Sequence, residues 1–265
     1  MFGPMTDLQA TPAAPATHAQ PSRHGDLPAS VEGRALFLDV DGTLLDIADR
    51  PEDVLVPPRL LDDLMRLSVR IEGALALVSG RSLARLRQFF PDLPCGLAGL
   101  HGAEIAYPNG THAAVQRSPE LQGAIEALSR ISAAWPGVEI EDKGGAFAAH
   151  YRLAPRFASA VEIEMERLAR QLGDQVVVQK GKCVIEIRPA GHDKGTALLG
   201  FMSQAPFAGR TPVAVGDDLT DEAMFRVANE LGGLSVKVGA PGGTLARGIV
   251  SSPDDVRAWI GNVAR

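Results

Sequence analysis

The stretch from Ala35 to Leu45 limits the possible folds of this chain most strongly, because a continuous apolar run ends in two aspartates and a glycine. Such a run is typical of a strand buried on both faces of a sheet. Side chains at positions i and i+2 of an extended chain share a face, so we expect Asp39 and Asp41 to point the same way. Burying two carboxylates there is costly without a cation. The stretch therefore predicts a cation site, although Asp-Gly also marks ordinary strand-ending turns.

Predicted strands and helices alternate before about residue 110 and again after about residue 190, whereas the segment between them has another pattern. Apolar runs predict strands at 35–39, 74–78, 96–100, 212–215 and 234–238, and helical spacing of apolar residues predicts helices between them. This alternation predicts an α/β fold with a doubly wound parallel sheet. Ligands of such sheets bind at the carboxyl ends of the strands.

Between about 112 and 187 the order changes to helix–strand–strand–helix–strand–strand, with turns of hairpin length. That order predicts an antiparallel sheet with two helices, which we interpret as an inserted α+β cap domain. The expected division is a core made of 31–110 and 188–265, and a cap made of 111–187. The first 30 residues are rich in Pro, Ala, Thr and Ser and predict a disordered tail without a secretory signal.

Composition excludes several classes of protein. The net charge is −6 and the basic residues are scattered, which argues against a nucleic-acid surface. No apolar run approaches the roughly 18 residues of a membrane-spanning helix. The two cysteines, Cys95 and Cys183, lie far apart and predict two buried, reduced thiols in a cytoplasmic protein. We expect a monomer that acts on a small molecule, with neither a nucleic acid nor a membrane as partner.

Acids and hydroxyls gather at the ends of the predicted strands. Asp39 and Asp41 follow one strand, Ser79 follows a second, and an acidic run from 217 to 221 follows a third. Lys194 begins a helix. Carboxylates together with phosphate oxygens suit Mg²⁺, and a hydroxyl and an ammonium group beside it would neutralise a phosphoryl group. Each feature has a simpler interpretation, because Ser79 could cap a helix and the acidic run could complement a helix dipole.

In combination these residues resemble the haloacid dehalogenase-like (HAD) phosphohydrolase superfamily. The matching segments are Asp-Val-Asp-Gly-Thr at 39–43, Ser79, Asp-Lys-Gly at 193–195 and Gly-Asp-Asp-Leu-Thr-Asp at 216–221. Within the superfamily the chain is similar to the trehalose-6-phosphate phosphatases. The segments that carry this narrower resemblance are 79–81, 99–104, 141–144, 150–152, 182–189 and 216–225. The resemblance implies a HAD-like, Rossmann-like core with a cap that selects the substrate.

The resemblance also implies a reaction, the Mg²⁺-dependent hydrolysis of trehalose 6-phosphate to trehalose and phosphate. Asp39 would attack phosphorus and form an aspartyl-phosphate, and Asp41 would act as general acid and then as general base. Ser79 and Lys194 would hold the phosphoryl oxygens. The Asp39 carboxylate, the Asp41 backbone carbonyl and Asp217 would bind Mg²⁺.

Two further groups of residues receive roles from the same resemblance. Asp218 and Asp221 would orient the metal ligands or Lys194. Sugar recognition falls chiefly on the cap residues Glu141, Lys143 and Glu186, although the pair at 141 and 143 also fits a solvated hairpin tip. Weaker candidates, some of which would only brace the site, are Arg81, His101, Glu104, His150 and Arg152. A separate cap suggests opening and closing, with hinges near Gly110 and Pro189.

Three other functions remain open at this point. A phosphatase for sucrose phosphate or a related sugar phosphate would use the same core residues. A phosphomutase would use the same covalent intermediate. A non-catalytic sugar-phosphate sensor would keep the pocket, but the intact Asp39 and Asp41 pair speaks against it.

Overall fold

The computed structural model describes residues 26–48, 50 and 53–265. Its larger sheet is built around β1 (Arg34–Leu38), which is fully buried from Ala35 onward. β10 (Thr211–Gly216) and β2 (Leu75–Val78) pair with β1 in parallel on its two sides. A strand covered on both faces has no polar side to offer, which explains the continuous apolar run in the sequence.

The larger sheet has eight strands in the order β12-β11-β10-β1-β2-β3-β4-β5. The strands not yet given are β3 (Gly96–Gly99), β4 (Glu104–Ala106), β5 (His112–Ala114), β11 (Leu234–Val238) and β12 (Gly248–Val250). The chain moves outward from β1 to β2 and β3 on one side, and from β10 to β11 and β12 on the other. The order therefore reverses between β1 and β10, and a crevice forms outside the carboxyl ends of the strands at such a point.

The helices of this larger unit pack in pairs. α1 (Leu60–Arg70) contacts α7 (Pro253–Val263), and α5 (Lys194–Met202) contacts α6 (Glu222–Glu230). The short helix α2 (Leu83–Phe89) packs on β3. Among the described residues, no helix is both long enough and apolar enough to span a bilayer.

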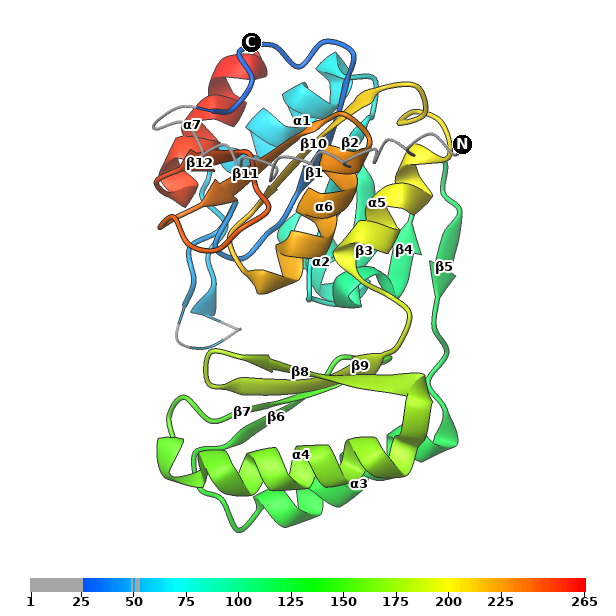
Figure 1. Cartoon of the computed structure of the whole chain (residues 1–265), viewed down its shortest axis with the longest axis vertical. Helices are drawn as coiled ribbons and strands as arrows, with labels where there is room; N and C mark the ends of the chain where they lie inside the picture. The colour runs from blue at the N-terminus through cyan, green and yellow to red at the C-terminus, as the bar shows by residue number, and fades with distance from the viewer. Residues whose placement is uncertain (1–25, 49, 51–52) are drawn as a thin grey trace, which may run out of the picture.

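A second, four-stranded antiparallel sheet has the order β6-β7-β9-β8. Its strands are β6 (Glu139–Asp142), β7 (Phe147–His150), β8 (Val176–Gly181) and β9 (Val184–Pro189). α3 (Pro119–Ser132) and α4 (Ala158–Leu172) cover the face of this sheet that points away from the larger unit (Figure 1). Leu128, Phe147 and Val161 belong to its own buried cluster, separate from the cluster around β1. The predicted fold class, an α/β core with an α+β insertion, is confirmed.

Short 3-10 turns join several of these elements: η2 (Leu100–Gly102), η3 (Pro155–Phe157), η4 (Gly173–Gln175) and η5 (Leu219–Asp221). Leu100 and Ala103, in and after η2, pack with Ala146 from the turn between β6 and β7. This small apolar cluster joins the two sheets beside the crevice.

The edges of the larger sheet differ from the prediction. β4 and β5 are antiparallel to their neighbours, so the sheet is mixed rather than wholly parallel. β12, which is Gly-Ile-Val, is too short for its apolar residues to predict a strand, and β5 is exposed along its whole length and has no apolar pattern. The predicted boundary at 110 falls in the turn between β4 and β5. The predicted cap ends at residue 187, but β9 continues for two more residues, to Pro189.

Part of the predicted disordered tail is ordered. Residues 1–25 lie outside the described part of the chain, but 26–30 pack against the core. The Trp259 indole donates a hydrogen bond to the carbonyl of Pro28 at 2.8 Å, and the Ile249 N–H donates one to the Asp26 carboxylate at 3.2 Å. The composition of this segment does not indicate these contacts, because its partners lie more than 200 positions away.

The alternative interpretation of Ser79 as a helix cap is wrong, and so is the predicted burial of Cys183. Ser82, not Ser79, caps α2, because its hydroxyl accepts the N–H of Arg85. Cys95 is buried as expected, and burial raises the pKa of its thiol to about 12, whereas Cys183 is partly exposed. Both thiols are free. Cys183 lies in the turn between β8 and β9 with a left-handed backbone (φ 63°) and belongs to none of the buried apolar clusters.

Candidate active site

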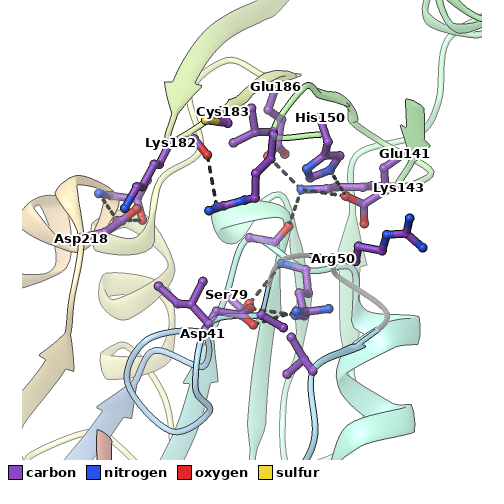
Figure 2. A pocket seen from close by; sticks show the side chains of 18 of the residues that line it. Asp41, Arg50, Ser79, Glu141, Lys143, His150, Lys182, Cys183, Glu186 and Asp218 are labelled. Carbon is purple, nitrogen blue, oxygen red and sulfur yellow. Dashed lines mark hydrogen bonds and ion pairs between the residues drawn. The ribbon is translucent and has the colours of Figure 1, made fainter. Parts of the chain in front are cut away.

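The carboxyl ends of β1, β2 and β10 open into a cavity of about 290 Å³ between the two sheets. Asp39 follows β1, Ser79 follows β2 and Asp217 follows β10, and all three line the cavity. The opposite wall comes from the smaller sheet and includes Glu141, Lys143 and Glu186. Figure 2 shows Asp41 and Ser79 on one side of this space, and Glu141, Lys143, His150 and Glu186 facing them from the other.

Lys194 is a buried cation between two carboxylates. Its ammonium nitrogen lies 2.6 Å from Asp39 Oδ1 and 2.6 Å from Asp221 Oδ1, and the lysine is 3% exposed. Burial alone would lower the pKa of Lys194, but the two carboxylates outweigh it and hold that pKa above its ordinary value. Asp193 begins α5 as an N-cap in a reciprocal capping box with Thr196, which fixes the turn that delivers Lys194.

Asp221 also organises the backbone of the acidic run. Its Oδ2 accepts the N–H groups of Asp217 and Asp218 at 2.9 and 3.0 Å. The carboxylate fits because residue 216 is glycine, where a Cβ would lie 2.2 Å from the Asp221 carboxyl carbon. Because Asp221 is fully buried and its oxygens are already bonded, it orients Lys194 and the loop that carries Asp217.

Carboxylate oxygens of Asp39, Asp217 and Asp221 lie within 4.8 Å of one another. Burial, followed by the neighbouring carboxylates Asp221 and Asp218, raises the pKa of Asp217 to about 7. Burial also raises the pKa of Asp39, against the opposing effect of Lys194. A set of crowded oxygen donors with one ammonium group between them fits a hard divalent cation such as Mg²⁺. Gly42, with a left-handed φ of 79°, leaves the space that the Asp217 carboxylate fills.

Asp41 forms a bidentate ion pair with Arg81. The guanidinium donates from Nε to Asp41 Oδ2 and from Nη2 to Oδ1, each at 2.7 Å. Ser79 is fully buried, and its hydroxyl accepts the Arg81 N–H at 3.1 Å. Arg81, a weaker candidate for sugar binding, thus contacts Asp41, the residue expected to act as general acid and base.

The wall formed by the smaller sheet is a network of opposite charges. Lys143 Nζ donates to Glu186 Oε2 at 2.8 Å and to the Gly80 carbonyl at 3.3 Å, so it contacts both units. Burial would lower the pKa of Lys143, but Glu186 and Glu141 raise it. Glu141 Oε2 lies 2.9 Å from His150 Nε2. Burial would raise the pKa of Glu141, but His150 and Lys143 lower it below its ordinary value. These residues are not a solvated hairpin tip.

His101 lies in η2 of the larger unit with a left-handed φ of 56°. Its Nε2 is 3.7 Å from Glu186 Oε2, and burial lowers the pKa of its imidazole. Its Nδ1 has no hydrogen-bond partner among the described residues, and neither does Glu186 Oε1. Unpartnered buried polar atoms are costly. Two such atoms beside a polar cavity are consistent with a ligand or water that supplies the missing bonds.

Three other predicted residues contact loops or helix starts around the cavity. Asp218 lines the cavity, but its carboxylate accepts the N–H and the hydroxyl of Thr220, both at 2.6 Å, and so caps η5. Glu104 accepts the N–H of Leu83 at 2.7 Å and braces the start of α2. Arg152 lines the cavity near the Lys182 carbonyl, at 3.5 Å.

The sequence of the chain matches the profile of one family, Trehalose-phosphatase, over residues 37–245. The chain belongs to the trehalose-phosphatase family. It is 46% identical over 239 residues to a probable trehalose-phosphate phosphatase of Sinorhizobium fredii, with 90% of each chain covered. It is 45% identical over 227 residues to the trehalose-6-phosphate phosphatase of Escherichia coli, with 85% of each covered.

A solved structure agrees with this membership. The C-terminal domain of Candida albicans trehalose-6-phosphate phosphatase superposes with a TM-score of 0.73 at 25% identity, covering 87% of this chain and 91% of that one. The predicted family and enzyme class are therefore confirmed, and the family match over 37–245 includes the whole smaller sheet and most strands of the larger one.

Several residues that line the cavity of this trehalose-phosphatase were not predicted from sequence. Glu139 on β6 shares a face with Glu141, two positions later, and this i, i+2 spacing was a usable signal. Lys182, Cys183 and Thr220 lie in turns, where no periodicity indicates which side chain faces a cavity. Arg50 also lines the cavity, and its Nε lies 3.8 Å from Glu139 Oε1.

Replacing Gly216 by alanine is expected to displace Asp221. The added methyl would overlap its carboxyl group and disturb the bonds to the 217–218 backbone, so we expect the free energy of unfolding to fall by about 2–3 kcal/mol. Urea unfolding measures this. Gly243→Ala is the matched control, because nothing lies within 4 Å of its Cβ position. Equal stability of the two variants would contradict the assigned packing.

The Glu186 carboxylate should stabilise the protein in a pH-dependent way. Burial would raise its pKa, but Lys143 and His101 lower it from 4.5 to about 2. The ionised carboxylate therefore stabilises the fold fully above about pH 4.5, and this stabilisation is lost as the pH falls through about 2. Glu186→Gln leaves the buried Lys143 charge with only the more distant Glu141 carboxylate, at 3.9 Å, and should cost about 3 kcal/mol at neutral pH.

Urea unfolding at neutral pH and at about pH 3 tests this expectation, since the difference between wild type and Glu186→Gln should shrink in acid. Glu126→Gln, on the exposed surface of α3, is the control. A difference that stays constant or grows in acid would show that the Glu186 charge is not what stabilises this wall.

Proposed function

We propose that this member of the trehalose-phosphatase family hydrolyses trehalose 6-phosphate to trehalose and phosphate, with Mg²⁺, through an aspartyl-phosphate on Asp39. One observation carries the proposal: the Asp39 carboxylate, paired with Lys194, faces a cavity whose opposite wall is lined by the charged side chains Glu141, Lys143 and Glu186. The named activities of the bacterial relatives support the choice of sugar phosphate.

In the first half of the reaction the Asp39 carboxylate attacks phosphorus. Lys194 and the Ser79 hydroxyl hold phosphoryl oxygens, and Asp41 donates a proton to the departing sugar oxygen. Asp39, the Asp41 carbonyl and Asp217 would hold Mg²⁺, which when bound offsets the negative charge shared by the nucleophile and the phosphate. Asp221 keeps Lys194 and the Asp217 loop in position for this arrangement.

In the second half, water displaces phosphate from Asp39 and gives a proton to Asp41, so the protein ends in its starting state. A cap made of the smaller sheet and its helices would exclude other water while this happens. Contact of Lys143 with the Gly80 carbonyl and of Glu186 with His101 supports a closed arrangement of the cap. The two free cysteines are compatible with the cytoplasm as its location.

Phosphate release from a panel of sugar phosphates tests the function. We expect trehalose 6-phosphate to be preferred over sucrose 6-phosphate and glucose 6-phosphate, and activity to disappear when EDTA removes the metal. Asp39→Asn should lower turnover by at least about 1,000-fold, because the nucleophile is lost. The exposed variant Asp174→Asn should keep full activity. Preference for sucrose 6-phosphate would favour the alternative sugar, and full activity of Asp39→Asn would refute the nucleophile.

Recognition of the sugar by the cap can be separated from the chemistry. Glu141→Gln removes a charged acceptor from the cap wall, so kcat/KM for trehalose 6-phosphate should fall by about 10- to 100-fold. Hydrolysis of p-nitrophenyl phosphate, which has no sugar, should change little. Glu126→Gln on the far side of the cap serves as control. If Glu141→Gln lowers both activities together, Glu141 does not act through the sugar.

A further inference from the structure

Arg81 is held from several sides, although it lines the cavity. Its side chain is 12% exposed and its guanidinium carbon lies 4.8 Å from the centre of the Phe89 ring. Its backbone is fixed as well, because its N–H donates to the Ser79 hydroxyl and its carbonyl accepts the N–H of Leu100 at 2.9 Å. An arginine fixed in this way has little freedom to follow a substrate.

The fixed guanidinium determines the orientation of Asp41. Two parallel N–H bonds of 2.7 Å reach both carboxylate oxygens, the geometry in which an arginine fork matches a carboxylate. The Asp41 side chain keeps 34% of its surface exposed, and that surface faces the cavity that Asp39 also lines. The carboxylate is thus open to the cavity but prevented from rotating.

We propose that Arg81 is a positioning residue, which holds the Asp41 carboxylate in the orientation needed to accept a proton from the hydrolytic water. This proposal rests on the proposed aspartyl-phosphate chemistry, and it replaces the sugar-binding role that the sequence suggested for Arg81. The loop that carries Arg81 is fixed from the cap side as well, through the bond from Lys143 to the Gly80 carbonyl.

The second half-reaction distinguishes a residue that positions Asp41 from a residue that binds the sugar. The water oxygen forms a bond to phosphorus, the bond from phosphorus to the Asp39 oxygen breaks, and its electron pair returns to the Asp39 carboxylate. The proton of the water goes to Asp41, and phosphate leaves. The sugar departed in the preceding step, so a residue that only binds sugar has no effect here.

The test compares Arg81→Lys with Arg85→Lys in the full chain with Mg²⁺ and p-nitrophenyl phosphate. Lysine keeps the charge but not the fork. Arg85 is the matched control, because its guanidinium lies 4.6 Å from the same Phe89 ring but bonds to Gln88. Stopped flow gives the rate of the first nitrophenolate release and the steady-state rate, and quenched samples give the fraction of phosphorylated enzyme.

For Arg81→Lys we expect the first release to stay close to wild type, since nitrophenolate leaves without a proton. The steady-state rate should fall by about 10- to 100-fold, the low end of what general base catalysis contributes. The ratio of the two rates should rise accordingly, and phosphorylated enzyme should accumulate. Arg85→Lys should match wild type in both rates.

Two results would overturn the proposal. Normal nitrophenyl phosphate turnover with a loss confined to trehalose 6-phosphate would make Arg81 a sugar-binding residue. Equal loss of both steps, without accumulation of phosphorylated enzyme, would make its role structural. Arg81→Gln, which keeps a planar end group, replaces Arg81→Lys if circular dichroism shows that the lysine variant does not fold. A wild-type protein that never becomes phosphorylated would instead refute the proposed function.

Discussion

The buried ion triad of Lys194 with Asp39 and Asp221 is the contact on which the site depends. Asp39 lies 155 positions before Lys194 in the chain, and Asp221 lies 27 positions after it. The two aspartates meet because β1 and β10 are neighbours where the strand order reverses. Removing one member of such a buried network leaves an uncompensated charge, which costs far more than an exposed ion pair. The triad therefore ties catalytic geometry to the fold, since Asp221 also holds the backbone that presents Asp217.

The triad also leaves an excess of negative charge. Asp217 adds a further carboxylate to a group that contains a single ammonium, and burial together with the neighbouring carboxylates raises its pKa to about 7. A divalent cation would relieve that crowding, and a phosphoryl group would then meet Lys194 and Ser79. On the opposite wall each carboxylate has a basic partner, because Glu186 is paired with Lys143, and Glu141 with His150. Groups suited to phosphoryl chemistry thus lie on the larger sheet, and groups suited to hydroxyls lie on the smaller one.

The sequence was sufficient for the features that depend on local pattern. The apolar run before Asp39 predicted a strand buried on both faces, and the helix–strand–strand order predicted the second sheet. It was insufficient where the partner is distant or the pattern is short. The choice between Ser79 and Ser82 as helix cap depends on the path of one loop, and β5 has no apolar side chain beyond alanine. The grip of Arg81 on Asp41 joins positions 40 apart, and no periodicity predicts such a contact.

The loop from Ser79 to Arg81 contacts both Asp41 and the smaller sheet. On one side its arginine fixes Asp41, and on the other its Gly80 carbonyl accepts a bond from Lys143 of the smaller sheet. His101 lies against the same loop, since a Cβ at Gly80 would fall 2.6 Å from its imidazole, and it approaches Glu186 at 3.7 Å. A larger residue at position 80 would therefore displace the imidazole of His101, which approaches Glu186 of the smaller sheet. The contacts that hold the smaller sheet over the cavity and the contacts that orient Asp41 therefore share three residues of backbone.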